Sequence, residues 1–244
     1  WCEQRLKINP EAGAIVPLRY NYPQREMRRI FQREMDKAIP VRIMVLKARK
    51  LGISTWMESV TYDWLTHIPN QNALILAHDS DGSDLLFEMF QTFYDFDEER
   101  RATRYSHQKG ITFQAPHSSR LRVQTAGKRY PGTSLTPQIA HLSEVAKWPD
   151  PQRIALSILN AIPDIAGTFA LMESTAAGAG DWFNEQWDLS SQWTKVFFPW
   201  FSIPERSMDP AAVNMEDLGE DDRYNLYDGE ERDLLALQSA HIGD

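Results

Sequence analysis

The sequence predicts an α/β protein built on a doubly wound, mostly parallel β-sheet. Short apolar segments with strand character alternate along the chain with longer segments whose apolar residues recur at helical spacing. The uninterrupted apolar segment 72–77 is typical of a strand that is buried on both faces of a parallel sheet. A loop that contains glycine and opens a helix follows the strand at 41–46. In such sheets, ligand chemistry lies at the carboxyl ends of the strands.

The hydrophobic pattern predicts the elements in order. We expect strands at 41–46, 72–77, 110–114, 120–125, 138–142, 168–172 and 196–200. We expect helices at 24–37, 54–66, 81–94, 151–160 and 182–189. The strands at 110–114 and 120–125 should pair as a hairpin around residues 116–119. The apolar face of helix 81–94 should comprise Leu85, Leu86, Met89, Phe90 and Phe93.

Composition favours one large domain with a small appendage. A chain of 244 residues with 42% hydrophobic content is long enough to bury a sizeable core. No apolar segment approaches the length of a membrane span, and no secretory signal is visible. The single cysteine, Cys2, excludes an internal disulfide and a cysteine zinc cluster. Because the chain begins with Trp1, we expect a trimmed or excised fragment.

Charge is unevenly distributed along the chain. The net charge is −8, yet residues 1–60 carry twelve basic against six acidic side chains. Residues 204–244 carry twelve acidic against three basic side chains and are rich in turn-forming residues. The acidic total is therefore mostly a property of the last segment, and it does not rule out a local basic surface that contacts DNA.

The loop after strand 41–46 has the character of a phosphate-binding loop. Its sequence is KARKLGIST, and backbone N–H groups at such a helix start can cradle phosphate oxygens. The Walker A pattern G-x-x-x-x-G-K-[ST] places Gly52 on the second glycine and Ser54 on the Mg²⁺-binding hydroxyl. Ile53 then occupies the lysine position, and Lys47 the first glycine. An ordinary strand–turn–helix with a solvated basic cluster is the other interpretation.

Three further segments extend the pattern. They are YNYPQREMRRIF at 20–31, LTPQIAHLSE at 135–144 and TFALMESTAAG at 168–178. Together with the loop, in this order, they resemble the ATPase domain of the large terminase subunit, the DNA-packaging motor of tailed bacteriophages and herpesviruses. The resemblance covers roughly residues 15–200 and implies a P-loop NTPase fold of the RecA/ASCE type. It divides the chain into an ATPase domain at 1–203 and an acidic lid or linker at 204–244, leading toward a nuclease domain that this fragment lacks.

The loop contains the candidate residues for binding phosphate and metal. Gly52 and the loop amides can cradle phosphate, and Ser54 can supply an oxygen to Mg²⁺, with Thr55 as the alternative. Lys47 is the main candidate for the phosphate-neutralising cation, because some terminases, that of phage lambda among them, are similar in carrying this lysine early in the loop. Arg49 is the alternative cation, since an arginine here also recurs in the family.

Glu144 is the expected water-orienting base. It ends a strand at the carboxyl edge of the sheet, and we expect it next to the loop strand, where it could polarise an attacking water. The resemblance implies an aspartate before it to hold Mg²⁺, but this chain has Ser143, a neutral and weaker partner. An exposed glutamate that merely ends a strand is the other interpretation of Glu144.

Two further motifs take roles from the resemblance. The segment Glu173–Ser174–Thr175–Ala176 resembles the coupling motif, in which the hydroxyls of Ser174 and Thr175 sense the γ-phosphate. Alternatively, Ser174 and Thr175 cap the next helix, which should start near Asp181. Gln24 resembles the glutamine that reads adenine, and Tyr22 could stack on the base. A plain helix-start residue is the alternative for Gln24.

Arg129 lies in a loop rich in glycine and proline that precedes the Glu144 strand. In similar motors, an arginine here reaches the nucleotide of the neighbouring subunit, which requires a ring of subunits. Contact of this loop with DNA, through Lys128 and Arg129, is the alternative.

The resemblance therefore implies hydrolysis of Mg²⁺-ATP coupled to movement of double-stranded DNA into a procapsid, without nuclease activity from this fragment. The implied partners are DNA, the portal protein, the small terminase subunit and further copies of the chain in a ring, in the host cell cytoplasm and away from membranes. Two alternatives stay open. One is a helicase-like ATPase, which would need further motifs and a second RecA-like domain. The other is a degenerate nucleotide-binding or DNA-docking module, favoured by Ile53 and Ser143.

Overall fold

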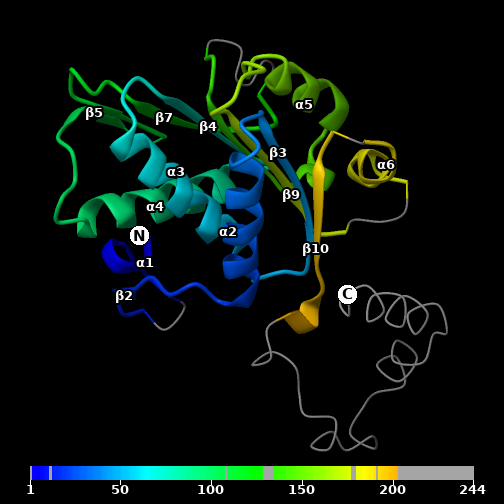
Figure 1. Ribbon diagram of the computed structural model, residues 1–244, viewed down its shortest axis with the longest axis horizontal. Helices are drawn as coiled ribbons and strands as arrows, with labels where there is room; N and C mark the ends of the chain where they lie inside the picture. Colours follow the sequence, from blue (N-terminus) through cyan, green and yellow to red (C-terminus); the bar gives the residue numbers. More distant parts are fainter. Residues whose placement is uncertain are drawn as a thin grey trace, which may run out of the picture. The chain divides into compact units, whose positions relative to one another are not determined.

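A computed structural model describes residues 2–10, 13–107, 109–128, 135–176, 180–190 and 192–202. Its main strands are β3 (Val41–Lys47), β4 (Asn72–Ala77), β5 (Thr103–His107), β6 (Gly110–Phe113), β7 (Arg120–Thr125), β8 (Ile139–Ser143), β9 (Phe169–Ser174) and β10 (Thr194–Phe198). Within the described residues these form an eight-stranded sheet in the order β10-β3-β9-β8-β4-β7-β6-β5 (Figure 1).

The sheet is mostly parallel. Neighbouring strands from β10 to β7 run parallel, whereas β6 and β5 extend the β7 edge in antiparallel fashion. The predicted α/β class is therefore confirmed, as is the hairpin of β6 and β7. The expectation that Glu144 follows a strand next to the loop strand is wrong, because β9 lies between β3 and β8. Strand order depends on pairing between distant segments, which the local pattern does not contain.

Helices cover both faces of the sheet. One face is covered by α2 (Tyr22–Met35), α3 (Ile53–His67) and α4 (Ser80–Phe96), and the other by α5 (Pro151–Leu159) and α6 (Trp182–Leu189) (Figure 1). Successive side chains of β3 point to opposite faces of the sheet. Ile43 packs into the hydrophobic core beneath α2, α3 and α4, and Met44 packs into the core beneath α5 and α6. Both residues are fully buried. The two cores lie on opposite faces of the sheet, and the polar residues described below lie at its carboxyl edge.

Most predicted boundaries are right to within two residues. Helix α2 begins two residues before the expected start, because Asn21 caps it in a reciprocal capping box with Gln24. Strand β10 begins and ends two residues before the expected strand at 196–200, and Trp200 belongs to the short helix η2 (Trp200–Ser202). On α4, Leu85 is exposed instead of buried, whereas Phe87 joins the core.

Several small elements were not predicted. They are α1 (Cys2–Arg5), the paired strands β1 (Lys7–Ile8) and β2 (Val16–Pro17), strand β5 and the helical turn η1 (Val145–Lys147). Elements this short carry too few periodic positions to reveal themselves in sequence. None of the helices in the described part of the chain is long and apolar enough to cross a membrane.

Candidate nucleotide-binding site

The loop between β3 and α3 turns tightly at Gly52. This residue is the N-cap of α3 and has a φ of +77°, a conformation that favours glycine. A Cβ at this position would lie 2.6 Å from Nε2 of Gln24, whose amide donates a 2.8 Å hydrogen bond to the Gly52 carbonyl. The first N–H groups of α3 have no partners within the helix, so the loop presents an anion-binding helix end.

Lys47, the last residue of β3, lies in the site and is almost fully buried. Its Nζ is 2.9 Å from Oε1 of Glu144 and 3.0 Å from Oε2 of Glu173. Burial alone would lower the pKa of Lys47, but the charges of the two carboxylates raise it, so the side chain is an ammonium. Arg49, the alternative cation, is exposed on the loop.

The two hydroxyls that open α3 point in different directions. Ser54 Oγ donates a 3.2 Å hydrogen bond to Oε1 of Glu173 and therefore belongs to the polar cluster. Thr55 Oγ1 instead lies 3.8 Å from the sulfur of Met89 on α4. The structure thus brings Ser54, and not Thr55, together with the other polar residues.

Glu144 leaves β8 with a left-handed backbone, at a φ of +53°. Its Oε1 pairs with Lys47, while its Oε2 accepts a 3.2 Å hydrogen bond from Thr175 and pairs with Lys147 at 2.9 Å. Burial and the nearby Glu173 carboxylate would raise the pKa of Glu144, but Lys47 and Lys147 outweigh them and lower it. Glu144 is therefore an ionised carboxylate held at the sheet edge, and the interpretation as an exposed strand end is wrong.

The end of β9 is bound to the end of β8. Ser174 Oγ, fully buried, accepts a 3.2 Å hydrogen bond from the backbone N–H of Ala146, and Thr175 donates to Glu144. The capping alternative is wrong, because Asp181 caps α6 by accepting from the N–H of Asn184. Ala176, the last residue of the motif, is exposed.

Gln24 and Tyr22 lie at the start of α2, beside the loop. Gln24 is buried, and its amide oxygen accepts from the N–H of Asn21 while its nitrogen donates to Gly52. A primary amide has two donors and two acceptor lone pairs, so these two hydrogen bonds use one of each. Tyr22 is 51% exposed.

Glu173 is the central residue of the polar cluster, although the sequence indicated it only as the first residue of the coupling motif. It is fully buried on β9, and its Oε1 accepts a 2.8 Å hydrogen bond from Ser143 in addition to that from Ser54. Burial would raise the pKa of Glu173, but the hydrogen bond from His141 and the charge of Lys47 lower it to about 2. An acidic residue within the apolar segment TFALMES was the signal that could have pointed to it.

A buried chain of charges continues behind Glu173. His141 Nε2 lies 3.4 Å from Glu173 Oε1, and His141 Nδ1 lies 2.7 Å from Oε1 of Glu58 on α3. Burial would lower the pKa of His141, but hydrogen bonds to both carboxylates raise it to about 9. Burial raises the pKa of Glu58. Polar residues within the apolar segments around positions 58 and 141 were the available signal.

Arg129, the expected trans-acting arginine, lies outside the described residues. Its neighbour Lys128 is exposed, beyond the end of β7.

The site as a whole is a compact set of fixed charges at the carboxyl edge of β3, β9 and β8. A helix N-terminus and the Lys47 ammonium suit an anion, and the Glu144 carboxylate suits a water molecule beside it. Among the described residues, no group of three or more His, Cys, Asp or Glu side chains is placed to hold a metal ion unaided. A Mg²⁺ ion at a nucleotide needs only one or two protein ligands, because phosphates and waters complete its shell.

Comparisons with known proteins give matches in structure alone. No family model and no curated protein sequence matches the chain. The large terminase of bacteriophage HK97 matches with a TM-score of 0.63 and 14% identity, over 88% of this chain and 48% of that protein. The large terminase of a thermophilic bacteriophage matches with a TM-score of 0.59 and 10% identity, over 82% of this chain and 48% of that one. The present chain thus spans about half the length of these two proteins.

An isolated domain gives a match of more similar length. The large terminase ATPase domain of Thermus phage P74-26 matches with a TM-score of 0.52 and 18% identity, over 68% of this chain and 78% of that domain. Identities this low establish the fold alone. On the sheet order, the loop and these matches, the chain has the α/β fold of the ATPase domain of bacteriophage large terminases.

Proposed function

We propose that the chain is the ATPase domain of a viral terminase large subunit, which hydrolyses ATP to move double-stranded DNA into a procapsid. The observation that carries this proposal is the convergence of Lys47, Ser54 and Glu144 at the carboxyl edge of a sheet with the terminase ATPase fold. Phosphoryl transfer to water needs a phosphate cradle, a metal ion, a positioned water and a cation. Each need has a residue of suitable chemistry here.

Nucleotide binding would use the loop and the start of α2. The Gly52 loop and the first N–H groups of α3 would cradle the phosphates, and Lys47 would neutralise them. Lys47 is preferred to Arg49 because its ammonium already lies inside the cluster. Gln24 would pair with adenine through the remaining donor and acceptor of its amide, while Tyr22 would stack on the base.

The oxygen-rich surroundings of the loop fit Mg²⁺, a hard cation that prefers hydroxyl, carboxylate and phosphate oxygens. Ser54 would offer its hydroxyl to the ion, and Ser143 would contribute through water. When bound, the ion would neutralise charge on the phosphates.

Glu144 would orient the attacking water and accept its proton. The Thr175 hydroxyl, which donates to Glu144, would sense the γ-phosphate together with Ser174, and Ala176 would complete this coupling motif. Because the Thr175 hydroxyl donates a hydrogen bond to Glu144, a displacement of either side chain would disturb the other.

The remaining assignments concern the assembled motor. Arg129 would act on the nucleotide of a neighbouring copy in a ring. Double-stranded DNA, the portal protein and the small terminase subunit would be the partners, in the host cell cytoplasm. Residues 204–244 would form a lid or linker segment.

The experiment is ATP hydrolysis with Mg²⁺, measured against protein concentration for the native chain and for Glu144→Gln. We expect turnover per subunit to rise with concentration, because an arginine supplied by a neighbour acts only after assembly. An arginine of this kind is worth about 10³- to 10⁵-fold in rate in related enzymes. Glu144→Gln should abolish turnover while ATP still binds.

The matched control is Glu88→Gln, which neutralises an exposed carboxylate on α4 and should leave hydrolysis unchanged. Hydrolysis unaffected by Glu144→Gln would refute the assignment of the base. ATP binding without turnover at any concentration, with or without DNA, would favour the degenerate module instead. Failure to bind ATP at all would refute the proposed function.

A further inference from the structure

Glu173 is a fully buried carboxylate that the roles proposed above leave unexplained. Its strand, β9, lies between β3, which carries the loop, and β8, which carries Glu144. Moving an isolated carboxylate out of water costs several kcal/mol even after the protein relaxes. A core position would therefore favour an apolar residue, as at the neighbouring Met172, unless the charge had a use.

The side chains around Glu173 connect it with the loop. Oε1 accepts hydrogen bonds from Ser54 at 3.2 Å and from Ser143 at 2.8 Å. Ser54 is the hydroxyl that opens α3 within the phosphate-binding loop. The carboxylate is thus bonded directly to the group that P-loop enzymes use as a Mg²⁺ ligand.

The second oxygen of Glu173 is differently placed. Oε2 is buried, and Lys47 Nζ lies 3.0 Å from it as an ionic partner. The same ammonium also pairs with Glu144 and is the proposed phosphate cation. When phosphate draws Lys47 toward itself, Oε2 of Glu173 is left as a buried anionic oxygen that needs a new cation.

The position of Ser143 completes the argument. P-loop enzymes hold Mg²⁺ with the loop hydroxyl and an acidic residue from a nearby strand. Before Glu144 on β8 stands Ser143, which has no charge, but the register pairs Ser143 with Glu173 on β9. Residues paired in this way project to the same face of the sheet. A carboxylate that could take the place of the acidic residue absent at Ser143 is therefore present on the neighbouring strand β9, at the position paired with Ser143.

We propose that Glu173, supplied by β9, is the acidic residue of the magnesium site, and that Ser143 and His141 position it. Ser143 and His141 hold Oε1 from the β8 side, and Glu58 in turn holds His141 through Nδ1 at 2.7 Å. This inference rests on the proposed function, because the ion binds together with a nucleotide in the loop. Its test must therefore separate metal binding from nucleotide binding.

The test measures the affinity of ADP by calorimetry with and without Mg²⁺, for the native chain and for Glu173→Gln. In the native chain we expect Mg²⁺ to strengthen ADP binding. In Glu173→Gln we expect this enhancement to fall about 10- to 100-fold, as it does when groups that support a metal are removed. Binding of ADP without Mg²⁺ should persist in the variant, since the phosphate cradle and Lys47 remain.

The double variant Ser143→Asp with Glu173→Gln moves the carboxylate from β9 back to β8. It should recover most of the Mg²⁺ enhancement, which a purely structural role of Glu173 would not predict. Glu88→Gln, which neutralises an exposed carboxylate on α4, is the matched control and should keep the full enhancement. An undiminished Mg²⁺ enhancement in Glu173→Gln would overturn the inference while leaving the proposed function intact.

A spectroscopic measurement covers the case in which Glu173→Gln does not fold. The Glu144→Gln chain, prepared with ¹³C-labelled glutamate carboxyl groups, is loaded with Mn²⁺ and ADP and studied by pulsed electron paramagnetic resonance. We expect a carbon hyperfine coupling from Glu173, and its absence would overturn the inference. If the native chain binds no ADP with or without metal, the proposed function fails first, and the inference fails with it.

Discussion

Lys47 is the residue on which the charge balance of the site depends. Its ammonium pairs with both Glu144 and Glu173, so each of these carboxylates loses one cationic partner if Lys47 is removed. Lys147 also pairs with Glu144, at 2.9 Å, but its side chain is 35% exposed, against 7% for Lys47. The two lysines therefore contact the same carboxylate in very different surroundings.

We predict that Lys47→Met lowers the free energy of unfolding by up to about 3–5 kcal/mol, because it removes one of the two cations, Lys47 and His141, that face the buried Glu173 carboxylate. Lys147→Met should cost less than about 1 kcal/mol, since exposed ion pairs are screened by water. Urea unfolding of the nucleotide-free chain measures both values. Equal losses from the two variants would show that burial of Lys47 does not set its contribution.

Among the elements, the junction of α2 with the loop decides how precisely the loop is held. Gly52 needs both a left-handed backbone and the absence of a side chain, because Gln24 of α2 approaches it closely. Gly167 has a similar φ of +82°, but a Cβ there would meet nothing within 4 Å. Both glycines have a left-handed backbone, but a side chain would collide with a neighbouring residue at Gly52 and would not at Gly167.

We predict that Gly167→Ala costs about 1–2 kcal/mol of unfolding free energy, the price of a left-handed alanine. Gly52→Ala should cost more and should also weaken ATP binding, because the loop must move away from Gln24. Urea unfolding and nucleotide titration measure the two effects. If both variants lose the same stability, contact with α2 does not constrain the loop.

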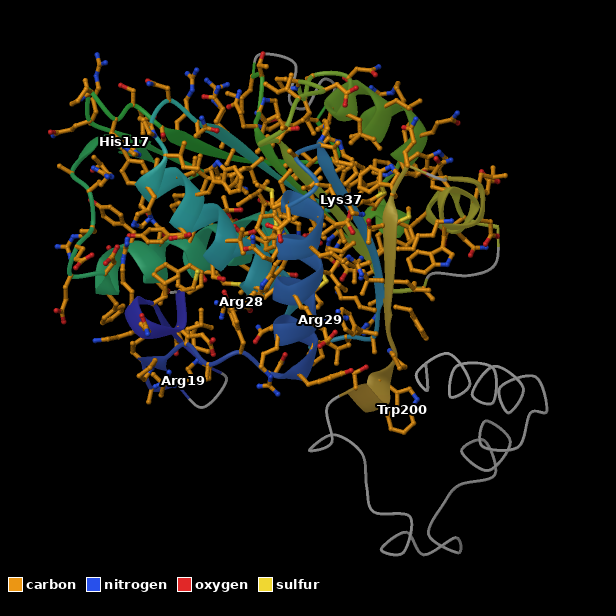
Figure 2. The ribbon with its side chains drawn as sticks, viewed as in Figure 1. Arg19, Arg28, Arg29, Lys37, His117 and Trp200 are labelled. Carbon is orange, nitrogen blue, oxygen red and sulfur yellow. The ribbon has the colours of Figure 1, made fainter. Side chains whose placement is uncertain are left out.

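Helix α2 also carries much of the positive charge of the first sixty residues. Figure 2 shows Arg28 and Arg29 on this helix and Lys37 just beyond its C-terminal end. Arg28 lies 3.7 Å from Glu3, Arg29 lies 2.9 Å from Glu26, and Lys37 pairs with Glu34. The positive charge that the sequence concentrates here is thus partly offset by nearby acidic side chains.

At the scale of the molecule, the pH dependence of folding reports on the buried histidine. His141, with a pKa raised to about 9 from an ordinary 6.5, faces Glu58 and Glu173. A raised pKa gives stabilisation that is complete below pH 6.5 and is lost as pH rises through 9. Glu173, with a pKa lowered to about 2 from 4.5, gives stabilisation that is lost only as pH falls below 4.5.

We predict that the native chain loses stability on the order of 3 kcal/mol between pH 6.5 and 9 because His141 gives up its proton. His141→Gln should be less stable at pH 6.5 and should show little change across this window. Urea unfolding at a series of pH values measures the difference. The control is His117→Gln, at another buried histidine (Figure 2), which should lose as much unfolding free energy over this pH range as the native chain. If the unfolding free energy of His141→Gln fell with pH as steeply as that of the native chain, the prediction would be contradicted.

The fold was largely predictable because its determinants are local. Segment 72–77 is apolar on both faces, and α4 has its core residues at helical spacing, so both elements were found from sequence. Among the site residues, the sequence drew attention to Lys47, Ser54 and Glu144 because each lies at a strand end or helix start. Their assigned roles stay predictions.

The rest of the site could not be read from local pattern. His141 contacts Glu58 across 83 positions of sequence, and their meeting depends on β8 lying beneath α3. The insertion of β9 between β3 and β8 likewise follows from long-range pairing. Glu173 was therefore taken as one letter of a motif instead of the centre of the polar cluster.

Two hydrogen bonds join the ends of β8 and β9, from Ala146 to Ser174 and from Thr175 to Glu144. Glu144 cannot turn away from this arrangement without depriving the Thr175 hydroxyl of its acceptor. The two strand ends are therefore tied to each other beyond the pairing of the strands. Anything that displaced the Glu144 carboxylate would also disturb the hydroxyl of Thr175, even if the sheet itself stayed in place.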